Sequence, residues 1–269
     1  MLSRGVRKAI VAACDSALPF RKIAPLTSAA DIAFVNLESP FSDTGPYHEG
    51  GLVFHAAPEM ISGLQLAGIA IASTANNHSR DCGSHGVDYT ISWLRSHGIT
   101  PVGSSESEQA THGGVILERH GIRFGFLGYT YDQQNGNWRD IDRRIALADP
   151  AVVADDVSSL RKRADIVIVS MHNGIEYMPR PSQKQIDFAH AAVDAGATLV
   201  IGHHPHVVQP EEHYRDGLIF YSLGNFVFDQ YQREATQQGE LVEVAFLGKR
   251  IIAEHTFRVR ITPTGPELE

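Results

Sequence analysis

The chain has 269 residues, of which 43% are hydrophobic and 20% charged, and its formal net charge is −8. These values are ordinary for a globular protein, and the negative charge argues against a surface that binds nucleic acid or anionic lipid. Two cysteines, Cys14 and Cys82, exclude a disulfide scaffold and a cysteine-rich zinc site, and no apolar run approaches the roughly 20 residues that span a bilayer.

The first segment predicts an amphipathic helix from Gly5 to about Ser16. Val11-Ala12-Ala13-Cys14 resembles a lipobox, but the apolar stretch before it is shorter than the roughly 7–15 residues of an export signal. We therefore expect no targeting signal in the chain as given. Its compartment stays open: cytoplasmic as given, or cell envelope if the natural start lies upstream.

Helices and strands then alternate along the chain. Hydrophobic periodicity and turn residues predict strands at 31–36, 69–72, 165–170 and 198–201, helices at 58–67, 84–97, 151–163 and 182–195, and a hairpin of 115–118 with 123–129. Three more strands, at 218–222, 240–246 and 251–259, crowd the C-terminus, and 39–51 and 132–142 are predicted loops. The pattern indicates one α/β domain over residues 1–269 with mixed sheets.

Polar side chains follow the predicted strands at the points where they end. They are Asn36 and Glu38, Asn77 and His78, His172 and Glu176, and His203, His204 and His206. The carboxyl ends of parallel strands share one edge of a sheet, which is where α/β folds bind their ligands. Imidazoles, amides and carboxylates gathered there suit one or two divalent transition metal ions.

His204-Pro205-His206 is the strongest of these signals. Neutral imidazole is a preferred ligand of such ions, whereas the alternative is a polar turn whose histidines occur by chance. Asn77 offers an amide oxygen, His78 a general acid and Asp81 an acceptor that would fix the imidazole tautomer; a turn with a helix cap is the alternative.

Four further residues are candidates with ordinary alternatives. His172 is predicted as a ligand or else a satisfied buried histidine, and Glu176 as an acid near the substrate or a solvated side chain. Glu38 would bridge two ions, or it would be a helix-start carboxylate. Asn225 is expected near the site, although Gly-Asn is also a common turn.

These segments resemble the CapA family, which is named for capsule and poly-γ-glutamate synthesis and belongs to the calcineurin-like metallophosphatase superfamily. The matching motifs are Asn36-Leu37-Glu38-Ser39-Pro40, Ala75-Asn76-Asn77-His78, His172-Asn173-Gly174-Ile175-Glu176-Tyr177, Gly202-His203-His204-Pro205-His206 and Tyr221-Ser222-Leu223-Gly224-Asn225-Phe226.

The resemblance implies a four-layer α/β/β/α sandwich with a binuclear metal centre at the strand ends. Asn77, His172, His204 and His206 match ligand positions of the superfamily. His78 matches the histidine that protonates a leaving group, and Glu38 stands about where a bridging acid is expected. Asn36, Asp81, Glu176, His203 and Asn225 are then expected to support the ligands or the substrate.

One departure from the family concerns the start of the chain. The family usually begins with a strand that ends in Gly-Asp, whose Asp is a ligand, followed by a Met-Leu-x-Arg-Gly-like stretch. Met1-Leu2-Ser3-Arg4-Gly5 resembles that following stretch, so the first strand is expected to be missing. Either the chain begins too late, or the protein has lost a ligand.

Two functions are compatible with these residues. The first is a metal-dependent hydrolase, with Mn, Fe or Zn, in which metal-activated hydroxide attacks a phosphoester or an amide-type bond and His78 protonates the leaving group. The second is a non-catalytic protein that binds an anionic polymer or assists capsule assembly through a degenerate metal site. Expected partners are an anionic polymer or phosphoester, without nucleic acid or a membrane span, and the oligomeric state stays open.

Overall fold

The computed structural model describes residues 1–45, 51–131 and 140–269. The predicted loops 39–51 and 132–142 therefore fall partly outside the described residues. The helices are α1 (Arg4–Ala13), α2 (Ala24–Thr27), α3 (Ile61–Leu66), α4 (Gly83–Ser96), α5 (Glu108–Gly113), α6 (Pro150–Leu160) and α7 (Gln183–Asp194), with 3-10 turns η1 (Leu18–Phe20), η2 (Pro58–Met60) and η3 (Glu234–Gln237). Every helix among the described residues is too short or too polar to span a bilayer.

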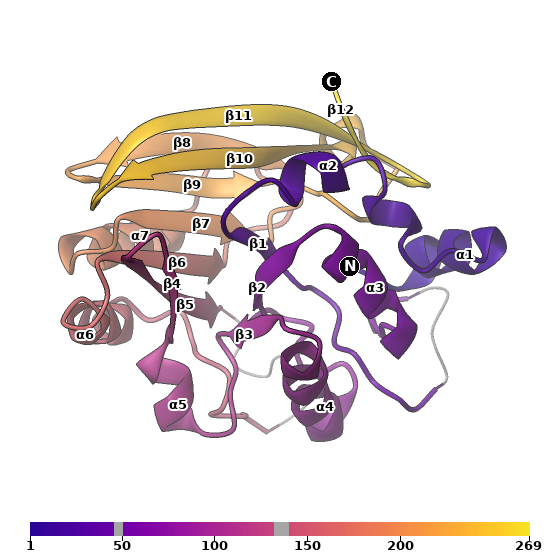
Figure 1. The fold of residues 1–269 in the computed structure, drawn as a ribbon, viewed down its shortest axis with the longest axis horizontal. Coiled ribbons are helices and arrows are strands. Elements are labelled where there is room, and N and C mark those ends of the chain that lie inside the picture. Colours follow the sequence, from indigo (N-terminus) through magenta and orange to yellow (C-terminus); the bar gives the residue numbers. More distant parts are fainter. Residues whose placement is uncertain (46–50, 132–139) are drawn as a thin grey trace.

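The largest sheet has six strands in the order β4-β5-β6-β7-β9-β8 (Figure 1). Its members are β4 (Val115–Arg119), β5 (Ile122–Thr130), β6 (Ile166–His172), β7 (Leu199–His203), β8 (Val208–Tyr214) and β9 (Gly217–Leu223). The four central strands run parallel, and the edge strands β4 and β8 run antiparallel to their neighbours. The predicted mixture of parallel and antiparallel pairing is confirmed.

Two smaller sheets complete the β structure. One is parallel and contains β1 (Ala33–Asn36), β2 (Ile69–Ser73) and β3 (Thr100–Val102). The other is antiparallel and contains β10 (Gln238–Leu247), β11 (Arg250–Thr262) and β12 (Gly265–Leu268). In Figure 1 this last sheet, in yellow, lies over the end of the six-stranded sheet.

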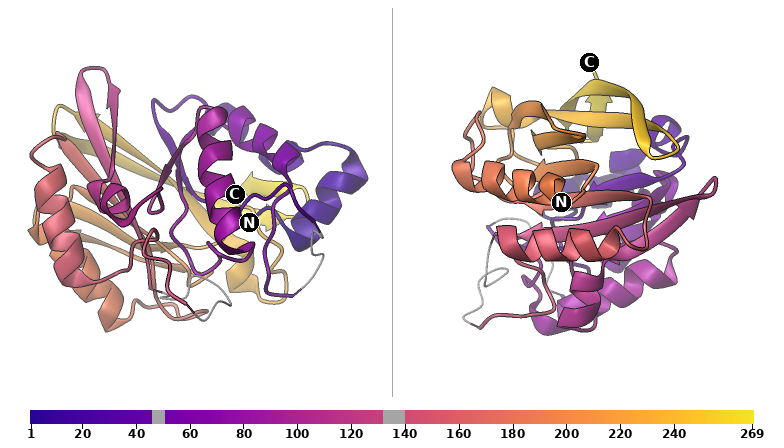
Figure 2. Two further views of the ribbon diagram at one scale, coloured as in Figure 1. Left: turned by 90° about the horizontal axis from the view of Figure 1, so that it is seen from below. Right: turned by 90° about the vertical axis from the view of Figure 1, so that its left-hand side faces the viewer.

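The layers form because successive side chains of each strand point to opposite faces of the sheet. On β6, Val167 and Val169 pack with α6 and α7 on the outer face, whereas Ile166 and Ile168 point to the inner face. The inner face meets Ile71 of β2 and the apolar side of β10. On the far side of β2, α3 and α4 close the second core. Figures 1 and 2 show these layers from three sides, and the expected four-layer α/β/β/α sandwich is confirmed. That the chain forms one domain stays a prediction.

Most elements lie where the sequence predicted them, for local reasons. Helix α7 begins at a capping box, in which Ser182 and Gln185 satisfy each other's backbone N–H groups. Helix α6 begins at Asp149, whose carboxylate accepts from two backbone N–H groups of the first turn. The predicted amphipathic helix near the N-terminus is α1, which buries Val6 and Ile10.

Several elements were not predicted, namely the helices α2 and α5, the 3-10 turns η1 and η3, and the strands β3, β8 and β12. Strand β8 contains Pro210, which has no N–H to donate and so argues against a strand. The structure tolerates it because β8 is an edge strand, so one side of its backbone needs no partner.

The three-stranded sheet and the six-stranded sheet approach each other closely near the carboxyl ends of their parallel strands. A Cβ atom on Gly128 of β5 would lie 3.2 Å from Gly103 Cα and 2.9 Å from Ser73 Oγ. Gly103 follows β3 and has φ +86°. Two glycines facing each other therefore set the distance between the sheets at this point.

Gly128→Ala is expected to push the sheets apart and to destabilise the protein by about 1–3 kcal/mol, the usual cost of overpacking. The measurement is the urea unfolding midpoint. Gly113→Ala is the matched control, because a Cβ atom there meets nothing within 4 Å. Equal midpoints for the two variants would contradict the role given to Gly128.

Asp156 of α6 joins three elements through one oxygen. Its Oδ2 accepts from the hydroxyl of Tyr129 on β5 and from Nδ1 of His112 on α5, both at 2.7 Å. The hydrogen bond to Asp156 raises the pKa of His112 above its ordinary value of 6.5, and burial partly opposes it. Because the raised pKa belongs to the folded state, protonated His112 stabilises the fold.

This stabilisation is complete below the unfolded-state pKa and is lost as the pH rises through the raised, folded-state pKa. The melting temperature of wild type minus that of His112→Gln is therefore expected to be larger at about pH 5.5 than at about pH 9. A difference that stays constant or grows with pH would show that the charge on His112 contributes nothing.

Candidate metal centre

The predicted site residues converge at the edge where both parallel sheets end. They follow β1 (Asn36, Glu38), β2 (Asn77, His78, Asp81), β6 (His172), β7 (His203, His204, His206) and β9 (Asn225). Of these, His78, His172, His204, His206, Glu38 and Asn225 are buried. Strand ends from both sheets thus supply one compact group of imidazole, amide and carboxylate side chains.

One hydrogen bond joins the two sheets inside this group. His172 Nε2, at the end of β6, lies 2.8 Å from Asn77 Oδ1, in the loop after β2. Asn76 holds that loop against the segment after β1. Its amide nitrogen donates to Leu37 O at 2.9 Å, and its Oδ1 accepts from His78 N at 3.1 Å. The loops after β1 and β2 are therefore held together before any ion is considered.

Glu38 is a carboxylate buried among histidines. It is 6% exposed, and its Oε1 lies 3.7 Å from His206 Nε2 and 4.0 Å from His78 Nε2. Its Oε2 accepts a long hydrogen bond from Asn36 Nδ2, whereas Oε1 has no hydrogen-bond partner among the described residues. Burial is the largest influence and would raise the pKa of Glu38, but the surrounding positive groups, His206 and His78 first and then the N-terminal amine and His204, together hold it below its ordinary value.

The tautomer of His206 follows from Asn225. The Asn225 amide nitrogen donates to Thr236 O at 2.9 Å and to Gln230 Oε1 at 3.2 Å, so its oxygen must be the acceptor toward His206. His206 Nδ1, at 2.9 Å, is then the donor, and Nε2 of the neutral ring carries a lone pair. A neutral His206 ring thus turns a lone pair toward Glu38, and a cation between the two, or a second proton on Nε2, would make the contact favourable.

Three histidines of the group, His172, His203 and His204, are held neutral. Burial lowers the pKa of His203 and of His204 to about 4, although Glu38 partly opposes this. Burial also lowers the pKa of His172 well below its ordinary range, and the neighbouring His204 adds to the effect. Neutral imidazole is the form that binds metal ions, so no proton has to be displaced from these rings near pH 7.

His78 is oriented from two directions. Its Nδ1 lies 2.7 Å from Asp81 Oδ2, and the side chain of Asp81 is almost completely buried. The ring stacks on Phe54 with centroids 3.8 Å apart and planes 19° apart. Nε2 is the end of the ring that faces Glu38, so a proton carried there points into the group.

Backbone strain is concentrated at the same place. Seven described residues other than glycine have positive φ; His204 and His206 belong to this group, and Tyr177 and Arg4 lie beside it. At His204 φ is +103°, and at His206 it is +59°. Such conformations cost of order 1–3 kcal/mol each and persist where function requires the geometry.

By its chemistry, the donor set suits a divalent transition metal ion. Glu38 Oε1 and His204 Nδ1 are buried without a hydrogen-bond partner among the described residues, and His206 Nε2 presents a lone pair beside them. An excess of acceptors without donors is costly in a buried site, and a cation removes that cost. Glu38, Asn77, His172, His204 and His206 are the residues that would hold it.

Two predicted residues lie at the margin. His203 packs its ring against Phe34 of β1, with centroids 6.1 Å apart, and is only partly buried. Glu176 is exposed in the loop after β6. Cys82 is close to His78 in sequence, but burial raises its thiol pKa to about 12, so it does not form a thiolate nucleophile near neutral pH.

Three residues near the centre carried no sequence signal strong enough to assign them. Phe54 stacks on His78, Tyr177 lies over His206 with centroids 6.3 Å apart, and Phe228 contacts the same ring at 4.8 Å. Tyr177 is the last residue of one quoted motif and Phe228 lies two residues after another, which was the only available indication. Nothing in the sequence around Phe54 connects it with His78.

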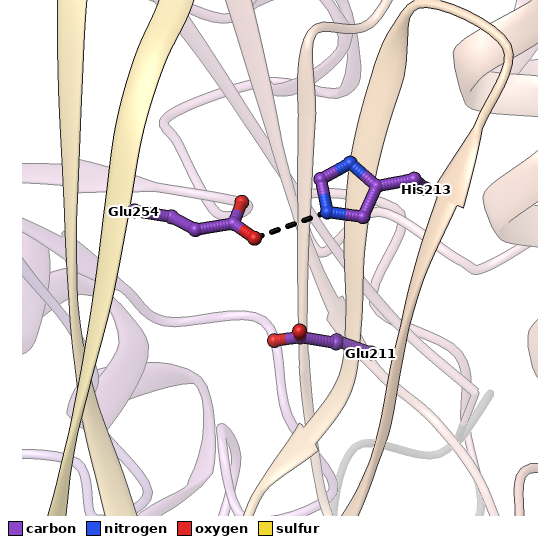
Figure 3. Close-up of side chains that lie close together, drawn as sticks. All are labelled: Glu211, His213 and Glu254. Atoms are coloured by element: carbon purple, nitrogen blue, oxygen red, sulfur yellow. Dashed lines mark hydrogen bonds and ion pairs between the residues drawn. The ribbon is translucent and has the colours of Figure 1, made fainter.

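A second group of potential ligands lies away from this centre. Glu211 and His213 share one face of β8, and Glu254 reaches them from β11 (Figure 3). His213 Nε2 pairs with Glu254 Oε1 at 3.0 Å, and the side chains of Glu211 and His213 are exposed. His213 pairs with Leu218, at the start of β9, whereas Asn225 follows the end of that strand. We interpret this group as a surface ion pair with a neighbouring carboxylate.

Comparisons with known proteins agree with the resemblance seen in the motifs. The capsule biosynthesis protein CapA of Bacillus anthracis is 34% identical over 239 residues, which cover 86% of this chain and 58% of that protein. The PGA biosynthesis protein CapA of Bacillus subtilis is 33% identical over 215 residues, covering 78% and 57%. The chain thus spans little more than half the length of these curated relatives.

A solved structure shares the fold. The crystal structure of a hypothetical protein from Thermus thermophilus superposes with a TM-score of 0.56 over 94% of this chain and 93% of that chain, at 17% identity. A family model described as "Bacterial capsule synthesis protein PGA_cap" matches residues 1–230. Since this match takes in every strand end that contributes to the centre, the chain belongs to the bacterial capsule synthesis protein family PGA_cap.

Proposed function

We propose that the chain is a metal-dependent hydrolase that cleaves a phosphoester or an amide-type bond in capsule or poly-γ-glutamate metabolism. The observation that supports this most is the environment of Glu38. A buried carboxylate oxygen without a donor faces the Nε2 atoms of His206 and His78. The side between Glu38 and His206 suits a cation. On the other side, His78 is able to transfer a proton.

Glu38, Asn77, His172, His204 and His206 would hold one or two divalent ions, with Mn, Fe or Zn the expected metals. A bound ion would lower the pKa of a water molecule and polarise the scissile bond. His78 would donate the Nε2 proton to the leaving oxygen or nitrogen, and Asp81, bonded to Nδ1, would stabilise the ring while it is charged. Because these residues come from both parallel sheets, we propose that the chain works as a single domain.

The proposed substrate is an anionic polymer or phosphoester. With a net charge of −8, the chain does not attract polyanions through its overall charge, so attraction has to be local. Beside the centre, the guanidinium of Arg233 lies 4.4 Å from the centroid of the Tyr177 ring, which in turn stacks on His206. Bound ions and Arg233 together would supply positive charge where a carboxylate or phosphate approaches.

A second candidate is a non-catalytic role in which the centre binds the polymer or assists its assembly. The names of the two Bacillus relatives favour it, because they describe biosynthesis rather than hydrolysis. The two candidates differ in the need for His78: a general acid is required for bond cleavage and is not required for binding.

His204→Ala and His206→Ala are each expected to remove most of the bound metal and to abolish hydrolysis, because each variant loses an imidazole ligand. The measurement is the metal-to-protein ratio by elemental analysis, beside turnover of phosphoester and amide-type substrates. His213→Ala is the control and should keep its metal. Metal retained in both ligand variants but lost with His213→Ala would place the ion at the Glu211–His213–Glu254 group instead.

His78→Gln is expected to lower kcat by roughly 10²–10⁴-fold, the usual contribution of a general acid, while the metal-to-protein ratio stays unchanged. Binding of poly-γ-glutamate is measured on the same variant. Hydrolysis by wild type that is lost in His78→Gln supports the hydrolase. Polymer binding in both proteins, with no cleavage by wild type of any substrate tested, supports the non-catalytic candidate.

A further inference from the structure

The segment Met1-Leu2-Ser3-Arg4-Gly5 matches a family motif, yet none of its side chains belongs to the proposed centre. In the structure it touches three segments that border the centre. Leu2 N donates to Ser39 Oγ at 2.9 Å, Ser3 Oγ accepts from His55 N at 3.1 Å, and Gly5 N donates to Asp229 Oδ2 at 2.9 Å. It thus connects the loop after β1, the segment 51–55 and the loop after β9.

Arg4 is the residue of this segment that reaches inward. Its side chain is 14% exposed and forms an ion pair with Asp229, which is 12% exposed. Its Nη1 also donates to Gly51 O at 2.9 Å, and its backbone has φ +48°. A long cationic side chain fixed by a buried carboxylate, a carbonyl and a strained backbone has little freedom to move.

The Arg4 guanidinium lies against the ring that orients His78. Its Cζ is 4.7 Å from the centroid of Phe54, within the range of a cation–π interaction. Phe54 in turn stacks on His78, with centroids 3.8 Å apart and planes 19° apart. Phe54 therefore contacts both Arg4 and His78.

Phe54 and His78 also share an acceptor. Asp81 Oδ2 accepts from the backbone N–H of Phe54 and from Nδ1 of His78. The stack fixes the plane of the imidazole, and the shared carboxylate fixes its rotation within that plane. The stack depends on the position of Phe54, which lies in a segment without regular secondary structure.

Arg4 contacts the other side of the centre as well. Its guanidinium lies 5.7 Å from the ring of Phe228, which is edge-on to Phe54 at 5.9 Å and packs against His206 at 4.8 Å. One cation therefore supports the aromatic ring beside the general acid and the aromatic ring beside a ligand.

We infer that Arg4 is a positioning residue: through Phe54 it holds the imidazole of His78 so that Nε2 faces Glu38 and the leaving group. The catalytic consequence rests on the proposed function, whereas the orientation of the ring does not. The alternative is a buried ion pair that stabilises the fold and leaves His78 unaffected. If Arg4 positions His78, a small change at Arg4 alters the environment of the His78 ring. If Arg4 only stabilises the fold, that environment stays the same.

The first test is NMR of the metal-free full chain, with the His78 Cε1–H signal assigned from its loss in His78→Gln. The face of Phe54 shields this proton, so Phe54→Leu should move the signal downfield. Arg4→Lys keeps the charge but loses the planar guanidinium, and we expect the signal to shift in the same direction or to broaden. Phe246→Leu, which removes a ring that contacts Phe124 far from the centre, is the control and should leave the signal unchanged.

An unchanged His78 signal in folded Arg4→Lys would overturn the inference. If Arg4→Lys does not fold, Asp229→Asn takes its place, because it frees the Arg4 side chain while keeping an acceptor of the same shape. The same shift of the His78 signal is then required. An unchanged signal in Asp229→Asn would overturn the inference equally.

The second test uses metal-loaded protein and two phosphoesters. An alkyl leaving group needs the proton from His78, whereas a nitrophenolate leaves without it, so Arg4→Lys and Phe54→Leu should lose on the order of tenfold in kcat on the alkyl ester and little on the nitrophenyl ester. Their metal-to-protein ratio should stay that of wild type. Equal losses on both esters would assign Arg4 a structural role only. Absence of hydrolysis by wild type would reject the proposed function and leave the NMR result to decide the positioning role.

Discussion

The candidate centre depends on one contact, the approach of two parallel sheets whose carboxyl ends lie at the same edge. Gly103 and Gly128 permit that approach because neither carries a side chain at the point of contact. The hydrogen bond between His172 and Asn77 then ties the end of β6 to the loop after β2. Residues far apart in the chain, such as Glu38 and His204, meet only because of this geometry. Any change in the spacing of the sheets changes every distance among the donors.

Electrostatics explains why this arrangement is costly as an isolated group. When His206 is neutral, the carboxylate of Glu38 and the lone pair on Nε2 of His206 face each other in a buried site, where repulsion is weakly screened. Neutral His172, His203 and His204 cannot supply the missing positive charge near pH 7. A ligand that binds the folded state alone adds to its stability, so a cation at this position would couple occupancy of the centre to the stability of both sheets.

The sequence was most informative where structure is local. Apolar strands followed by polar residues placed Glu38, Asn77, His172 and His204 at strand ends, and each lies there. It was least informative where contacts are long-range: the stacking of Phe54 on His78 joins two loops and leaves no periodic trace. Strand β8 was missed because Pro210 argues against a strand until its edge position is known. The roles given to the site residues, and the metal itself, stay predictions.

The strained backbone at His204 and His206 has a consequence for how such a centre assembles. Strain of order 1–3 kcal/mol per residue is a cost of folding, and Pro205 between the two histidines limits the ways in which the loop can relax. The imidazoles are therefore preorganised, so binding of a ligand would not include the free-energy cost of reshaping the loop. Substitutions that relax this loop would therefore raise the thermal stability of the protein and weaken binding at the proposed centre.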